Sequence, residues 1–328
     1  MKSVSKELSV FLISLVLISA LLYSASEHFS PVYPNEKFRI EKLLRSAGTI
    51  EAISVGDSHS LGLDFRAMNI RGFPLWKGGS DLFEVCYFLN AVTPRLTRLR
   101  IVFLDISPMV FARDNGSYAA FQPIRQTYYY MTPTVRSWRL INGDLKNFVR
   151  GKLSPILRAD HWSGVAKFLA ASLFHSKVHQ DKPVDEFGYV RQKPTVEARS
   201  ATKTAYQRFE PVLAYTWGNT DVEKASYHEL ASTLKMLRQK KIRVILFTTP
   251  FPEMVAKYLL TKRGTELQRT RQYAQRLQRE CDVEYYDLLQ DESFSTRYDY
   301  FIDENHLNQV GAEVFSRKLA GLISKQEK

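Results

Sequence analysis

The sequence has few cysteines, no internal repeat and no low-complexity tract. Only two of its 328 residues are cysteines, Cys86 and Cys281, and they lack the close spacing of zinc ligands. They either pair in an oxidising compartment or stay as two buried thiols, since Cys86 lies in an apolar stretch typical of a helix. The absence of a repeat excludes solenoids and propellers. With 45% hydrophobic and 12% aromatic residues, the chain has enough apolar side chains to form one globular domain with a large core.

Acidic residues are scarce relative to basic ones. The chain has 46 lysines and arginines against 34 aspartates and glutamates, a formal net charge of +12. No recognition motif for nucleic acid accompanies this charge, so we predict no nucleic-acid partner. Anionic lipid headgroups or an acidic polysaccharide of the cell envelope are better candidates, and a well-solvated basic surface is the alternative.

One long uncharged run is present over residues 8–25, after Lys2 and Lys6. As a helix rising about 1.5 Å per residue it spans about 27 Å, close to the ~30 Å hydrocarbon core of a bilayer. We predict an uncleaved single-pass anchor over residues 1–28, with a cleaved signal peptide as the alternative. Because the flanking lysines stay in the cytoplasm, residues 29–328 are expected to form a domain on the outer side.

Residues 50–61 end an apolar strand and begin a helix. The run up to Val55 is followed by Gly56, which permits a sharp turn, and by Asp57 or Ser58 as a helix cap. Ser58 would then lie at the carboxyl end of a strand, where an open α/β sheet places its ligands, and at a helix N-terminus, which favours a developing negative charge. Its hydroxyl is a candidate nucleophile, and a simple capping role is the alternative.

A second motif near the C-terminus places Asp303 three residues before His306, ahead of a helical pattern. This spacing lets the Asp303 carboxylate reach Nδ1 of His306 within one turn, so that Nε2 can face a serine. Ser58, His306 and Asp303 therefore provide a nucleophile, a base and an acid that orients the base.

These two motifs, Gly56-Asp57-Ser58 and Asp303-x-x-His306, resemble the end blocks of the SGNH, or GDSL, hydrolase superfamily. The resemblance covers approximately residues 50–122 and 240–323. It implies a Ser58–His306–Asp303 catalytic triad, an acyl-serine intermediate, and no metal or nucleotide cofactor. It also implies an oxyanion hole in which the backbone N–H of Ser58 acts with that of Gly79 or Gly78, the glycines of the turn that follows the second strand.

The chain departs from the superfamily at the third strand. Where the family carries Gly-x-Asn-Asp, this sequence has Leu104-Asp105-Ile106-Ser107. An ionised Asp105 would repel a developing oxyanion. Either Ser107 replaces the family's asparagine as a donor, or the oxyanion hole has only backbone donors.

Apolar runs at five places predict five strands with helices between them. The expected strands are residues 50–55, 70–76, 100–106, 242–250 and 283–286, and the expected helices are residues 36–46, 81–91 (capped by Ser80), 221–239, 266–280 and 309–324. This order predicts an α/β fold with a doubly wound, mostly parallel, flavodoxin-like five-stranded sheet. Residues 109–219 are too long for an ordinary connection and are expected to be an insertion after the third strand.

The anchor and the Gly-Asp-Ser-His-Ser sequence are similar to the membrane-tethered members of the superfamily that accompany membrane-bound O-acyltransferases. Those members include the D-alanyl-transfer protein of teichoic acid modification and the acetylation proteins of exopolysaccharide export. The resemblance implies an O-acyltransferase or esterase that acts on an envelope polymer, tethered to a bacterial cytoplasmic membrane beside such an acyltransferase. The alternative is a non-catalytic assembly or polysaccharide-binding protein that retains the fold.

Overall fold

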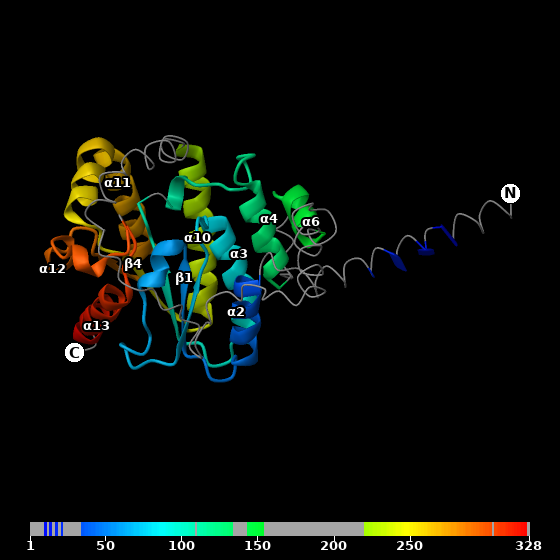
Figure 1. Ribbon diagram of the computed structural model, residues 1–328, viewed down its shortest axis with the longest axis horizontal. Coiled ribbons are helices and arrows are strands. Elements are labelled where there is room, and N and C mark those ends of the chain that lie inside the picture. The colour runs from blue at the N-terminus through cyan, green and yellow to red at the C-terminus, as the bar shows by residue number, and fades with distance from the viewer. Residues whose placement is uncertain are drawn as a thin grey trace, which may run out of the picture.

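The protein is built on a five-stranded parallel β-sheet, shown in the computed structural model of Figure 1. The structure describes residues 34–108, 110–133, 143–153, 220–303 and 305–326, together with residues 10–11, 13–14, 17–18 and 21. The strands are β1 (Ala52–Gly56), β2 (Gly72–Trp76), β3 (Ile101–Asp105), β4 (Arg243–Thr248) and β5 (Glu284–Asp287), in the spatial order β2-β1-β3-β4-β5. The predicted α/β fold and five-stranded sheet are confirmed, and all four strand pairs are parallel.

Eight helices and four 3₁₀ turns surround the sheet in the described part of the chain. The α-helices are α2 (Pro34–Arg45), α3 (Leu82–Val92), α4 (Gln122–Met131), α6 (Leu145–Lys152), α10 (Thr220–Gln239), α11 (Glu253–Cys281), α12 (Glu292–Ser295) and α13 (Gln309–Gln326). The 3₁₀ turns are η1 (Ser58–Gly62), η2 (Thr93–Arg95), η3 (Val110–Ala112) and η4 (Tyr298–Tyr300). Figure 1 shows α12 and α13 at one side of the molecule and α2, α4 and α6 at the opposite side.

The two largest of the three hydrophobic clusters among the described residues lie on opposite faces of the sheet, because successive residues of a strand point to opposite faces. Val102 and Leu104 of β3 contribute to one core, which also contains the apolar faces of α3 and α10. Phe103 between them contributes to the other core, with Phe315 and Leu319 of α13. Both faces of the sheet are therefore covered by helices, which leaves the strand ends as the place for polar side chains.

Four details differ from the sequence-based predictions. No α-helix follows Ser58, where the chain makes only the short turn η1. The N-cap of α3 is Asp81 rather than Ser80, because Asp81 accepts from the Glu84 N–H in a capping box. Helix α11 begins well before residue 266 and is kinked at Arg263. Both cysteines are buried free thiols, so of the two alternatives for Cys86 and Cys281 the thiol interpretation is correct.

Two predictions fall largely on residues that the structure does not describe. Most of the expected anchor, residues 1–28, lies outside the described residues, and so do residues 109, 134–142 and 154–219 of the expected insertion. No helix among the described residues has both the length and the apolarity to cross a membrane.

The start of α13 packs tightly against Tyr300, which precedes the loop carrying Asp303 and His306. A Cβ added at Gly311 would lie 2.2 Å from the Tyr300 carbonyl oxygen, whereas a Cβ at Gly321 of the same helix would meet nothing within 4 Å. The short contact at Gly311 is with backbone, which cannot rotate away.

We expect Gly311→Ala to lower the free energy of unfolding by about 1–3 kcal/mol, the usual cost of overpacking. Gly321→Ala is the matched control and should raise it by about 0.5–1 kcal/mol, because alanine favours a helix over glycine. Urea unfolding of the two purified variants measures both changes. Equal effects at the two positions would contradict the close packing at Tyr300.

Candidate active site

Ser58 lies immediately beyond the carboxyl end of β1, in a turn whose shape depends on Gly56. Gly56 has φ of 149°, and a Cβ there would lie 3.0 Å from Cβ of Asp105. Asp57 caps the following turn by accepting the His59 N–H at 2.9 Å. Because η1 is a single 3₁₀ turn, the expected contribution of a helix dipole to Ser58 is not available from this element.

The structure brings the three predicted triad residues into one chain of hydrogen bonds. Ser58 Oγ lies 2.7 Å from His306 Nε2, and His306 Nδ1 lies 2.9 Å from both carboxylate oxygens of Asp303. Since a carboxylate can only accept, Nδ1 carries the proton and Nε2 accepts from the serine. The side chains of His306 and Asp303 are 24% and 37% exposed, so the ring can meet a ligand from solvent.

Asp303 remains ionised beside the histidine. Burial raises its pKa, but the hydrogen bond and electrostatic attraction of the His306 ring N–H and the backbone N–H groups of Asn305 and His306 outweigh burial, and the pKa lies below its usual value. The carboxylate is therefore able to fix the His306 tautomer at neutral pH.

Directly beneath this triad lies a second acid–histidine pair, Asp57 and His59. His59 Nδ1 is 2.8 Å from Asp57 Oδ1, and His59 is only 4% exposed. The His59 ring stacks on the His306 ring, with centroids 5.2 Å apart and planes inclined by 18°. The sequence Gly56-Asp57-Ser58-His59 contains this pair, but no role for His59 was predicted from it.

Asp105 meets Asp57 across the ends of β3 and β1. Burial raises the pKa of Asp105 well above its usual value, and the charge of Asp57 and a hydrogen bond to its carboxylate raise it further. Burial also raises the pKa of Asp57, but the electrostatic attraction and the hydrogen bonds of the His59 N–H groups outweigh this and lower it. Asp105 is therefore the protonated partner at neutral pH, so the repulsion expected from an ionised Asp105 does not arise.

Ser107 belongs to the same buried group. Its hydroxyl is fully buried and donates to Asp57 Oδ2 at 3.2 Å, so its proton is engaged by a carboxylate. Asp57, His59 and Asp105 also place three ligand atoms within 4.8 Å of one another, a spacing that could hold a metal ion.

The predicted oxyanion glycines lie on the loop between β2 and α3, which is held by a neighbouring loop. Asn115 donates through Nδ2 to the Gly79 carbonyl at 2.9 Å, and its backbone N–H donates to Asp81 at 2.6 Å. Gly79 has φ of 73°, a conformation that favours glycine. A Cβ added at Gly78 would have no atom within 4 Å, so space does not require glycine at this position. The roles of Gly79 and Gly78 in an oxyanion hole stay predictions.

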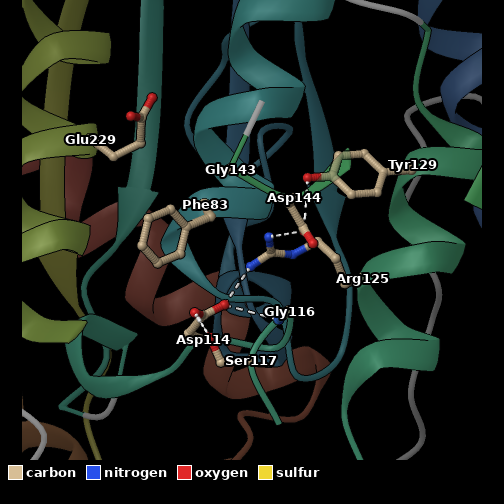
Figure 2. A pocket seen from close by; sticks show the side chains of 9 residues that line it. All are labelled: Phe83, Asp114, Gly116, Ser117, Arg125, Tyr129, Gly143, Asp144 and Glu229. Carbon is tan, nitrogen blue, oxygen red and sulfur yellow. Dashed lines mark hydrogen bonds and ion pairs between the residues drawn. The ribbon is translucent and has the colours of Figure 1, made fainter. Parts of the chain in front are cut away.

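A buried arginine reinforces this loop. Arg125 pairs with four carboxylates, those of Asp81, Glu84, Asp114 and Asp144. Burial and the charge of Asp81 raise the pKa of Glu84 to about 7. A pocket of about 290 Å³ lies beside Arg125. Figure 2 shows the residues that line it, with Glu229 of α10 on the opposite side from Tyr129. None of the triad residues lines it, so this pocket is separate from Ser58.

No protein-family model and no curated protein matches the chain. The geometry of the site is therefore the basis for proposing a function.

The buried acid pair generates a prediction about pH. Because the folded chain keeps the Asp105 proton at pH values where the unfolded chain has lost it, Asp105 reduces stability increasingly as pH rises above about 4. Asp105→Asn removes this dependence and still offers Asp57 a donor. We expect the stability of the variant relative to the wild type to increase with pH, with a slope of up to about 1.4 kcal/mol per unit.

Urea unfolding at intervals between pH 4 and pH 8 measures this difference. Asp282→Asn is the control, since the Asp282 side chain is 74% exposed. A difference between wild type and Asp105→Asn that stays constant over this range would show that Asp105 titrates alike in the folded and unfolded chains.

Proposed function

We propose that this chain is a serine-dependent acyl-transfer enzyme, an O-acyltransferase or esterase that acts on a cell-envelope polymer. The observation that carries the proposal is the hydrogen-bonded series Ser58–His306–Asp303, in which each donor meets an acceptor. The arrangement satisfies the geometric requirements of nucleophile, general base and orienting acid.

In the proposed reaction, Ser58 Oγ attacks an acyl carbonyl while its proton moves to Nε2 of His306. The tetrahedral intermediate then expels its leaving group, which takes the proton from His306, and an acyl-serine remains. A polymer hydroxyl or water next gives its proton to His306 and attacks the acyl carbon, and Ser58 recovers a proton from His306. Asp303 stabilises the imidazolium that forms in each half-reaction.

The membership of the SGNH superfamily and the cellular setting are part of the same proposal. The sheet order β2-β1-β3-β4-β5 is consistent with SGNH-like folds. The two motifs, the apolar run over residues 8–25 and the net charge of +12 support a membrane-tethered enzyme facing outward. Its partners would be a membrane-bound O-acyltransferase and an anionic lipid or acidic envelope polymer.

The nucleophile can be identified by covalent labelling. A fluorophosphonate probe should label wild-type protein, and Ser58→Ala should abolish both labelling and acyl turnover while lowering stability by at most about 1–2 kcal/mol, the cost of losing a polar residue at a turn. Ser60→Ala is the matched control, because the buried Ser60 hydroxyl only donates to the Asp57 carbonyl. Labelling that persists in Ser58→Ala would refute the assignment.

The same protein preparation separates transfer from hydrolysis. Incubation with an activated ester and an envelope polysaccharide should yield acylated polymer if a polymer hydroxyl resolves the acyl-serine, and free acid if water does. Turnover of neither kind would favour the non-catalytic assembly or polysaccharide-binding alternative.

Location is testable independently of catalysis. A periplasmic phosphatase fused after Lys328 should be active in a bacterial host, and the fusion should stay with membranes after a high-salt wash, because an inserted apolar helix is not released by salt. A silent phosphatase together with an active cytoplasmic reporter would rule out the envelope-polymer substrate, whatever the role of Ser58.

A further inference from the structure

The triad is assembled from two chain segments that are remote in sequence. Ser58 belongs to the turn after β1, and its hydrogen bond to His306 spans 248 positions of the chain. A second hydrogen bond runs beside it between the same two segments, from Asn305 Nδ2 to His59 Nε2, with a distance of 2.9 Å. Each partner in this second bond is the chain neighbour of a partner in the first.

His59 is enclosed on every side by groups that fix its ring. Asp57 holds Nδ1 at 2.8 Å and Asn305 holds Nε2 at 2.9 Å. The Phe251 ring packs edge to face against His59 with centroids 5.2 Å apart, and the His306 ring stacks on it, also at 5.2 Å. A ring held by two hydrogen bonds and two aromatic neighbours has one orientation.

The hydrogen bonds also define which ring nitrogen carries the proton. The Asp57 carboxylate can only accept, so Nδ1 of His59 donates to it. The Asn305 amide donates to Nε2, so Nε2 carries no proton and the imidazole is neutral. A neutral ring can stack against His306 even when His306 becomes positively charged during proton transfer, because no like charges are brought together.

We propose that His59 is a positioning residue that aligns the Ser58 turn with the loop of Asp303 and His306. This inference rests on the proposed acyl-transfer function. His59 is hydrogen-bonded to the turn through Asp57 and to the loop through Asn305. Its ring also stacks on the ring of His306, whose Nε2 contacts Ser58. His59 itself does not react with substrate, since both of its nitrogens are engaged and it is only 4% exposed.

The experiment compares two replacements of His59 with opposite hydrogen-bonding ability. Glutamine offers an amide oxygen to accept from Asn305 and an amide nitrogen to donate to Asp57, at nearly the spacing of the two ring nitrogens. Phenylalanine keeps a ring for stacking but loses both hydrogen bonds. The readouts are kcat and KM for an activated ester and the rate of fluorophosphonate labelling at Ser58, with thermal unfolding as the check on folding.

We expect His59→Phe to lower kcat and the labelling rate about 10-fold to 100-fold, with KM changed by no more than about twofold, because displacement of catalytic groups affects chemistry rather than binding. His59→Gln should retain rates within about fivefold of wild type. His228→Phe, at an exposed histidine on α10, is the control for the substitution itself and should match wild type.

A double-mutant cycle tests the hydrogen bond between the segments. Asn305→Ala alone should reduce the labelling rate by no more than His59→Phe does, and the double variant should be no slower than the slower single variant, since both changes remove the hydrogen bond between His59 and Asn305. Fully multiplicative losses would overturn the proposal.

Other results would also overturn the proposal. Labelling at the wild-type rate in both His59→Phe and Asn305→Ala would show that the alignment does not matter. An equal loss of kcat and of labelling rate in His59→Gln and His59→Phe would show that the imidazole itself takes part in the chemistry. One equivalent of bound metal in the wild type that is absent from His59→Gln would show that His59 is a metal ligand. A wild-type protein that is neither labelled nor active overturns the proposed function first, and with it the reaction that His59 is inferred to serve.

Discussion

The parallel pairing of β1 with β3 is the constraint on which the site depends. It brings the carboxyl ends of the two strands so close that a Cβ at Gly56 would lie 3.0 Å from that of Asp105. The residues that follow each strand must then share a small buried space. Asp57 therefore meets Asp105 and Ser107, and the next residue, Ser58, is only half-buried.

Two layers with different electrostatics result from this arrangement. In the exposed layer, an ionised Asp303 and the His306 ring face solvent, where charge can develop and be screened. In the buried layer, one proton on Asp105 and a neutral His59 leave a single negative charge on Asp57. Burying two carboxylates side by side without a proton would be costly, so protonation accompanies folding.

A separate group of charges supports the neighbouring loop. Arg125 neutralises part of a cluster of four carboxylates that includes Asp81, and Asn115 connects this cluster to Gly79. The loop is therefore held at two points, the Gly79 carbonyl and the helix cap Asp81. In a chain whose net charge is +12, this local concentration of acid has a structural explanation and does not need a cationic ligand.

The sequence by itself determined the order of the strands, the mostly parallel class of the sheet, and the pairing of Asp303 with His306. These features are local: alternation fixes a strand, and a spacing of three residues lets an acid reach a histidine within one turn. Sequence reasoning could not extend the same logic to the turn after Ser58, because Leu63 and Phe65 are apolar for core packing rather than for a helix. It also missed His59 and Asn305, and it assumed an ionised Asp105. Only the tertiary structure decided those points, since the His59–Asn305 contact joins residues 246 positions apart and the protonation of Asp105 follows from burial beside Asp57.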